Sequence, residues 1–179
     1  MPYAVTHILV AVLLIELFRK YFVQDKKNFP RYYILIAAIG GIIPDFDILA
    51  YYLLSFFGFT FEQIHRTFLH TIFIPLILFL IGIITLKFSI KNSKTGKRHM
   101  KIPVIFFILA SGTTIHLLLD MLIDPLILFY PLSNFAVGIE TLSHLPEKLN
   151  LLVPPSVDGA LLLLWLFWME FKLKITDYF

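Results

Sequence analysis

Residues 102–120 read IPVIFFILASGTTIHLLLD, an apolar run that carries two ionisable side chains near its end. The run approaches the ~20 residues that a helix needs to cross a bilayer. His116 and Asp120 are four residues apart, so they share one face of a helix and are spaced to bind one metal ion. The alternative to metal binding is that the two side chains are a polar pair that faces water at the end of the helix. The stretch therefore predicts a transmembrane helix whose polar end has a chemical role.

The composition of the whole chain is that of a membrane protein. Of the 179 residues, 59% are hydrophobic and 15% are charged, and the mean hydropathy is +0.85. Soluble domains are nearer ~45–50% apolar. No linker or internal repeat divides the chain, so residues 1–179 are expected to form a single integral membrane domain. The net charge of +3 gives no reason to infer a nucleic-acid partner, and the absence of cysteine excludes thiolate ligands.

Five apolar segments are candidates for helices that cross the membrane. They are Tyr3–Phe18, Tyr32–Ile43, Thr71–Leu86, Ile102–Leu119 and Gly159–Phe171. A further apolar and aromatic stretch, Ile48–Phe61, is interrupted by Gly58 and is interpreted as a re-entrant or interfacial helix. The expected fold is therefore all-α: a polytopic membrane helical bundle of about five transmembrane helices plus one re-entrant or interfacial helix.

The basic residues predict the orientation of these helices. Five Lys or Arg residues lie between the first two segments, six between the third and fourth, and two after the fifth. In a five-span arrangement all of them share one side, and cytoplasmic loops are the ones enriched in Lys and Arg. The N-terminus is then outside, the C-terminus is cytoplasmic, and only Arg66 and Lys148 fall on the outer side.

This orientation brings the polar residues of the chain together. Four clusters fall at the outer ends of the predicted helices: Thr6-His7, Pro44-Asp45-Phe46-Asp47, His65-Arg66-Thr67-Phe68-Leu69-His70, and His116 with Asp120. His and Asp are side chains that bind catalytic divalent metals. We therefore expect one metal site at the extracytoplasmic face.

The first two clusters also have simpler interpretations. Asp45 and Asp47 follow Pro44, which disfavours helical backbone at the residue before it, and this favours a turn. In a turn the two carboxylates bridge two metal ions, or each one is a ligand on its own. Asp47 alternatively caps the helix that follows it. His7 is a single histidine on a long apolar helix, which is commonly a packed or interfacial residue.

The third cluster contains two histidines and an arginine. On a regular helix, residues five apart point roughly 140° apart, since each residue turns the helix by ~100°. His65 and His70 therefore share one metal only if a loop lies between them; otherwise they serve different metals or have no joint role. Arg66 suits a phosphate clamp, or pairs with Asp45 or Glu62, or reaches lipid headgroups. Glu62 is a candidate outer partner of the site, and Glu140 and His144, which are four residues apart, are candidates for further ligands.

The order of these motifs resembles a known family. The chain has Thr6-His7, Ile43-Pro44-Asp45-x-Asp47, His65-Arg66-x-x-x-His70 and His116-x-x-Leu119-Asp120 ahead of Tyr130-Pro131. This series, over about residues 1–133, resembles the membrane-bound metal-dependent hydrolases of the YdjM-like family, LexA-regulated inner-membrane proteins of bacteria that are held to be distantly similar to zinc-dependent phospholipase C and the P1-type nucleases. One departure is the absence of glycine between Asp120 and Pro131.

The resemblance implies a helical inner-membrane protein with a divalent-metal site. The positions that it carries over as metal ligands are His7, Asp45, His65, His70, His116 and Asp120, while Asp47 and Arg66 match the family pattern. The cofactor implied is one to three divalent ions, Zn²⁺ first, with Mn²⁺ or Fe²⁺ as alternatives.

Two hypotheses about function follow. In the first, the protein is a membrane-embedded hydrolase of a phosphoester in an amphiphilic, lipid or lipid-linked substrate; a metal activates water, Asp47 orients that water or acts as base, and Arg66 offsets phosphoryl charge. In the second, a non-enzymatic membrane protein binds or transports metal ions or protons. Transport requires polar groups along a whole path, and the cytoplasmic halves of the predicted helices offer few.

Overall fold

The computed structural model describes residues 4–24, 27, 29–91, 101–141 and 145–173, and these residues are folded almost entirely into helices. In chain order the elements are α1 (Ala4–Tyr21), α2 (Tyr32–Gly40), the 3-10 turn η1 (Ile43–Phe46), α3 (Asp47–Leu54), the 3-10 turn η2 (Ser55–Phe57), α4 (Phe61–Ile64), α5 (Phe73–Lys91), α6 (Lys101–Ile123) and α7 (Glu147–Leu173). The only β-structure in these residues is an isolated bridge between Leu126 and Val137. The all-α prediction is confirmed.

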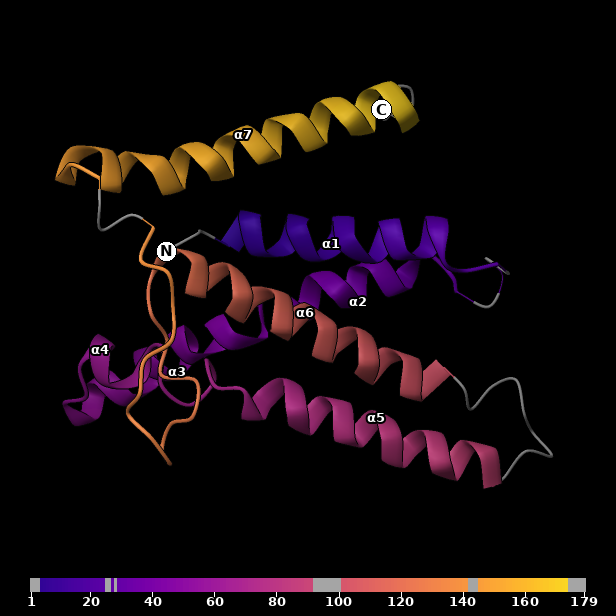
Figure 1. Cartoon of the computed structure of the whole chain (residues 1–179), viewed down its shortest axis with the longest axis horizontal. Helices are drawn as coiled ribbons and strands as arrows, with labels where there is room; N and C mark the ends of the chain where they lie inside the picture. The colour runs from indigo at the N-terminus through magenta and orange to yellow at the C-terminus, as the bar shows by residue number, and fades with distance from the viewer. Residues whose placement is uncertain (1–3, 25–26, 28, 92–100, 142–144, 174–179) are drawn as a thin grey trace.

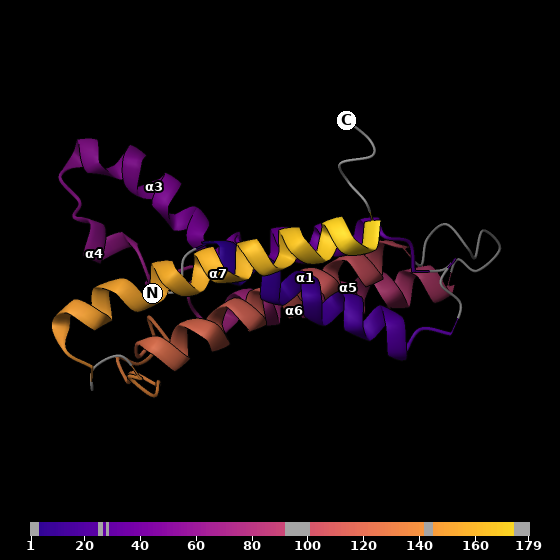
Figure 2. The same cartoon turned by 90° about the horizontal axis from the view of Figure 1, so that it is seen from above.

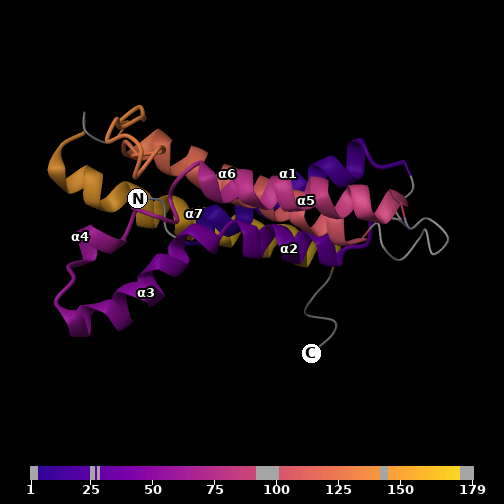
Figure 3. The same cartoon turned by 90° about the horizontal axis from the view of Figure 1, so that it is seen from below.

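The long helices lie side by side along the longest axis of the molecule (Figure 1). Helices α5 and α6 are antiparallel neighbours, so α5 begins at the end of the bundle where α6 finishes (Figure 1). Helix α1 also begins at that end (Figure 1). Helix α7 packs along α1 at one edge. The short helices α3 and α4 project away from the bundle at that same end (Figures 2 and 3).

Helices α2 and α6 approach each other very closely at a pair of glycines. A Cβ atom on Gly112 would lie 2.8 Å from backbone atoms of Gly40 and from the carbonyl oxygen of Ala37. Small residues at a helix crossing allow the backbones to come into contact, which is a common way for membrane helices to associate. The crossing holds the carboxyl end of α2, and the polar residues that follow it, against α6.

Three of the described helices are long and apolar enough to cross a membrane. They are the segments Phe73–Ile90, Lys101–Ile123 and Glu147–Phe171; Tyr32–Gly40 together with Ile43–Phe57 adds a fourth if this pair, bent by 56°, counts as one span. Only 11% of the first segment is buried, so most of its apolar side chains face outward, as contact with lipid requires. The predicted number of five transmembrane helices is not confirmed.

One predicted segment differs from the helix observed, and another is broken where the sequence predicted. The last span was expected over Gly159–Phe171, but α7 begins twelve residues earlier, at Glu147. Pro154 and Pro155 lie inside the helix, a position that membrane helices tolerate more readily than soluble ones. The stretch Ile48–Phe61 is broken at Gly58 as predicted, where φ is +86° and glycine is the residue that adopts this backbone without strain.

Candidate metal centre

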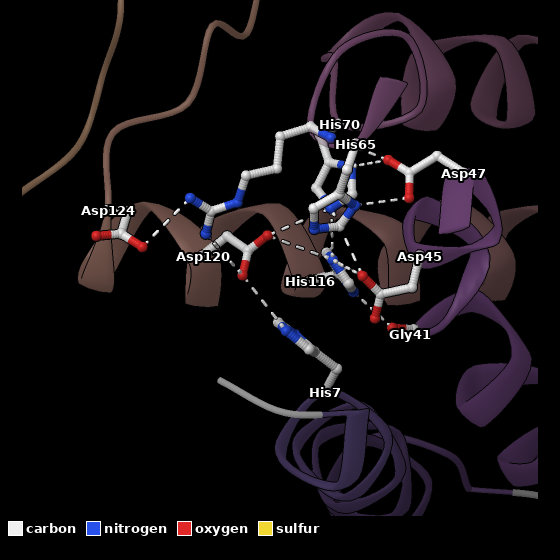
Figure 4. A network of polar contacts seen from close by, with 10 residues as sticks. His7, Gly41, Asp45, Asp47, His65, His70, His116, Asp120 and Asp124 are labelled. Atoms are coloured by element: carbon white, nitrogen blue, oxygen red, sulfur yellow. Dashed lines mark hydrogen bonds and ion pairs between the residues drawn. The ribbon is translucent and has the colours of Figure 1, made fainter. Parts of the chain in front are cut away.

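The four polar clusters meet at one end of the bundle (Figure 4). His7 comes from α1, Asp45 from η1, Asp47 from the start of α3, and His116 and Asp120 from α6, while His65 and His70 lie in the loop between α4 and α5. The structure therefore brings these residues together at one end of the bundle. Their side chains form three overlapping groups close enough to share an ion: His7, His116 and Asp120; Asp45, His70 and His116; and Asp47, His65 and His70.

At the centre lie four donor atoms, which we call the central quartet: Asp45 Oδ1, His70 Nε2, His116 Nε2 and Asp120 Oδ2. The two histidine nitrogens are 3.3 Å apart. Asp45 Oδ1 lies 3.7 Å from each of them. Asp120 Oδ2 lies 3.4 Å from the His70 nitrogen and 3.5 Å from the His116 nitrogen. Donors held about 2.0–2.1 Å from a tetrahedral zinc ion are about 3.3–3.4 Å apart, so the separations among His70 Nε2, His116 Nε2 and Asp120 Oδ2 match such an ion, and those of Asp45 Oδ1 from the two histidine nitrogens are slightly longer.

Each histidine of the quartet is oriented through its other ring nitrogen. His116 Nδ1 donates to the carbonyl oxygen of Gly41 at 2.7 Å, and His70 Nδ1 lies 3.0 Å from Asp47 Oδ2. Gly41 follows the end of α2, where carbonyls have no partner within the helix. A neutral imidazole that is protonated on Nδ1 presents a lone pair on Nε2, and such outer partners are typical of metal-binding histidines. Two facing lone pairs repel each other unless a cation lies between them.

Asp120 is the clearest sign that the site is built for a cation. It is 1% exposed, and neither of its oxygens has a hydrogen-bond partner within the described residues. A buried carboxylate without hydrogen bonds is strongly disfavoured unless a positive charge is bound to it. Asp45 and Asp47 add further negative charge nearby, and Arg66 is the only lysine or arginine at the described site. The residues present therefore fit a divalent metal ion.

His7 lies beside the quartet. Its ring stacks on that of His116 with the centroids 3.7 Å apart, and its Nε2 is 3.4 Å from Asp120 Oδ1. The oxygen that it faces is the one that the quartet does not use. His7 is thus placed as a further ligand or as a partner of Asp120, and its Nδ1 is buried without a hydrogen bond.

Asp47 joins the α4–α5 loop to the site. Its Oδ1 lies 2.8 Å from His65 Nδ1, and its Oδ2 accepts a hydrogen bond of 3.0 Å from the backbone N–H of Arg66. The interpretation of Asp47 as a helix cap is wrong, because α3 begins at Asp47 without a side-chain cap. The loop between His65 and His70 is the junction that their spacing required, and it allows both rings to contact Asp47.

Arg66 pairs with acids other than those considered from the sequence. Its Nη1 donates to Asp124 Oδ2 at 3.2 Å, and its Nη2 lies 3.8 Å from Asp120 Oδ1. Asp124 comes from the segment after α6, and no sequence pattern pointed to it. Arg66 has φ of +63°, an uncommon conformation for a residue other than glycine, which the Asp47 contact to its N–H helps to hold. Its Nε and Nη2 are buried without hydrogen bonds.

The protonation of His70 shows how strong the local negative charge is. Burial disfavours the imidazolium, but the carboxylates of Asp45 and Asp47 outweigh burial and raise the pKa of His70 to about 9. In metal-free protein His70 is therefore protonated at neutral pH, and a metal ion has to displace that proton.

The remaining predicted residues are not part of this site as described. Glu140 is exposed, with φ of +53°, and belongs to none of the groups of described residues that are close enough to share an ion. The Glu62 side chain and His144 fall outside the described part of the chain. One further buried acid, Asp158, was missed, although an acid within the apolar run of α7 is a signal that could have identified it.

A comparison with protein-family models matches residues 1–175 to the family described as YdjM inner membrane protein. The match includes every residue of the candidate metal centre and extends beyond the 133 residues that carried the resemblance in sequence. No curated protein and no solved structure matches the chain. The apolar helices agree with a membrane location. The chain therefore belongs to the family of YdjM inner membrane proteins.

Proposed function

We propose that the protein is a membrane-embedded, divalent-metal-dependent hydrolase of a phosphoester in a lipid or lipid-linked substrate. The observation that carries the proposal is the central quartet, in which a buried carboxylate without hydrogen bonds faces two oriented histidine nitrogens. Asp45, His70, His116 and Asp120 would hold the ion, with His7 and His65 beside them for a further one. Zn²⁺ suits this donor set best, and Mn²⁺ or Fe²⁺ are the alternatives.

A bound ion of this kind acts as a Lewis acid and lowers the pKa of water toward about 7. The side chains around the quartet have the other roles in the proposed hydrolysis. Asp47 keeps His70 and His65 in place, since both of its oxygens are engaged by the loop. Because both oxygens are engaged in this way, we assign Asp47 the role of orienting the two histidine side chains. Its role as a base stays a prediction from sequence.

The substrate would approach from the side of Arg66 and Asp45. Their side chains are 22% and 20% exposed, whereas those of His7, His70, His116 and Asp120 are at most 2% exposed. The Nε and Nη2 of Arg66, which make no hydrogen bond within the described residues, would donate to phosphoryl oxygens, for which a guanidinium is well suited.

An apolar groove next to the site supports a substrate with a hydrocarbon chain. The groove has a volume of about 550 Å³ and lies between α5 and α6, with Ile72 and Ile115 near one end and Phe79 and Phe107 near the other. Ile72 and Ile115 adjoin the quartet in sequence, at His70 and His116. The hydroxyls of Ser111 and Thr114 in its wall donate to carbonyls of their own helix, so the wall offers little to a polar ligand.

The proposal includes the topology. With α1 and the bent pair α2–α3 counted as spans, the protein has five transmembrane helices, the N-terminus outside and the C-terminus in the cytoplasm, and the metal centre lies at the extracytoplasmic face. Cysteine residues placed singly at exposed positions near each end, and labelled in intact cells with a membrane-impermeant reagent, test this orientation.

The activity is tested with purified protein in liposomes. We expect hydrolysis of a phospholipid or a lipid-linked phosphoester that stops on chelation, returns with Zn²⁺ or Mn²⁺, and is lost in Asp120→Ala. Metal uptake into sealed vesicles without hydrolysis would instead favour the transport hypothesis. That hypothesis has less support, because the other end of the described bundle has the apolar core formed by Ile15, Phe29, Tyr33, Ala37 and Ile108.

A further inference from the structure

Asp158 is a buried acid that the proposed hydrolase site does not use. It lies near the middle of α7 and is 7% exposed, within a segment apolar enough to cross a membrane. A carboxylate in such surroundings is costly unless hydrogen-bond donors are aimed at it. The identity of those donors therefore indicates why the acid is there.

Both donors come from one residue at the start of α1. The backbone N–H of Thr6 donates to Asp158 Oδ1 at 2.9 Å, and the Thr6 hydroxyl donates to the same oxygen. Thr6 is in the first turn of α1, where N–H groups have no carbonyl partner within the helix. Asp158 thus caps α1 from a position 152 residues away, and its charge is favourable at the amino end of a helix.

The residue after Thr6 is His7, which is part of the metal centre. The carbonyl of His7 is packed against Gly41 so tightly that a Cβ on Gly41 would lie 2.8 Å from it. The ring of His7 stacks on His116 and faces Asp120 at 3.4 Å. The first turn of α1 is therefore held on one side by α2 and on the other by Asp158, and His7 is positioned between these two restraints.

We infer that Asp158 is a positioning residue for the metal centre, which caps the first turn of α1 and so holds His7 against Asp120 and His116. The inference rests on the proposed metal centre. It assigns α7 a role in that centre, although α7 contributes no side chain to the central quartet and packs mainly on α1.

The test measures Zn²⁺ affinity by competition with a chromophoric chelator, together with the absorption spectrum of the Co²⁺-loaded protein. We expect Asp158→Leu to weaken metal binding about tenfold, as the loss of an outer partner does, and to change the Co²⁺ spectrum. Asp158→Asn keeps an acceptor oxygen for Thr6 and should restore most of the affinity. Leu161→Ala is the matched control, because Leu161 lies in the α1–α7 contact one turn further along α7 and should leave both readouts unchanged.

A double-mutant comparison separates this role from a general effect on folding. If Asp158 acts through His7, then Asp158→Leu causes no further loss of affinity in a His7→Ala background. An additive loss in that background, or wild-type affinity and spectrum in Asp158→Leu, would overturn the inference while leaving the metal centre in place. Wild-type protein that binds no metal would overturn the centre and the inference together.

Thr6→Val provides a second variant if Asp158→Leu does not fold. It keeps the shape of the side chain and removes only the hydroxyl, so the backbone hydrogen bond to Asp158 remains. We expect a loss of metal affinity of about fivefold, equivalent to one hydrogen bond, and none in the His7→Ala background. Unchanged affinity in Thr6→Val would count against the inference.

Discussion

The described bundle has two buried regions of opposite chemistry, and helices α1 and α6 contribute to both. At one end of the bundle, Ile15, Tyr33 and Ile108 belong to an apolar core in which dispersion and exclusion of solvent stabilise the packing. At the other end, α1, α6 and the segments that follow α2 and α4 bury the candidate metal centre, where Asp120 has no hydrogen bond within the described residues. The apolar end is stabilised by its own packing, whereas the polar end holds side-chain groups that could bind a metal ion. Folding and metal binding should therefore be separable by substitutions at the two ends.

The largest effect on metal binding is expected from His116→Ala. His116 supplies a donor to the central quartet, stacks on His7 and donates a hydrogen bond to the Gly41 carbonyl. Its replacement by alanine therefore removes a metal ligand and also the ring that packs against His7. We expect metal affinity to fall by more than about 100-fold, beyond the usual cost of losing an outer partner. Elemental analysis of the purified variant measures this. A variant that retains wild-type metal would mean that the ion, if any, is bound elsewhere.

The converse variant at the apolar end is Ile108→Ala. Ile108 is 4% exposed within the apolar core, and truncation of such a side chain costs about 2–5 kcal/mol through lost packing and the cavity that remains. We expect a lower melting temperature in detergent and unchanged metal affinity. If Ile108→Ala instead loses metal in proportion to its stability, the two ends are not independent.

Asp47→Ala tests the outer partner of His70. We expect metal affinity to fall about 10- to 100-fold, because His70 loses its ion pair and the backbone N–H of Arg66 loses its acceptor. Asp47→Asn, which keeps an oxygen for the Arg66 N–H, should lose less. The measurement is a competition titration with a chromophoric chelator. Equal losses in the two variants would show that the charge of Asp47 matters and its hydrogen bonds do not.

The smallest change in stability is expected for Arg66→Gly. Glycine adopts a φ of +63° without strain, so the free energy of unfolding should stay within about 1 kcal/mol of wild type. Metal affinity should be unchanged, while inhibition by inorganic phosphate is lost with the guanidinium. Arg66→Val, which is β-branched, is the control for the backbone and should be less stable. Persistent phosphate inhibition in Arg66→Gly would remove Arg66 from the substrate site.

The sequence predicted the assembly of the polar residues better than it predicted their individual partners. His7, Asp45, His70, His116 and Asp120 could be grouped because the predicted helix ends and the distribution of basic residues predict that all five lie on one side of the membrane. Short-range features, such as the break at Gly58, could also be predicted from the sequence.

What could not be predicted depends on contacts between distant segments. The pairing of Arg66 with Asp124 and of Thr6 with Asp158 is determined by how the helices pack, which local patterns do not encode. The early start of α7 was missed because the predicted span was limited to the apolar run from Gly159, whereas α7 continues through Pro154 and Pro155 toward Glu147.

The most direct measurement is the X-ray absorption spectrum of protein loaded with one equivalent of Zn²⁺. The central quartet predicts four nitrogen and oxygen neighbours at about 2.0–2.1 Å, with the outer scattering of two imidazole rings. In His116→Ala the imidazole contribution should fall, or no zinc should bind. A spectrum without imidazole, or one identical in wild type and His116→Ala, would contradict a metal centre built from His70, His116, Asp45 and Asp120.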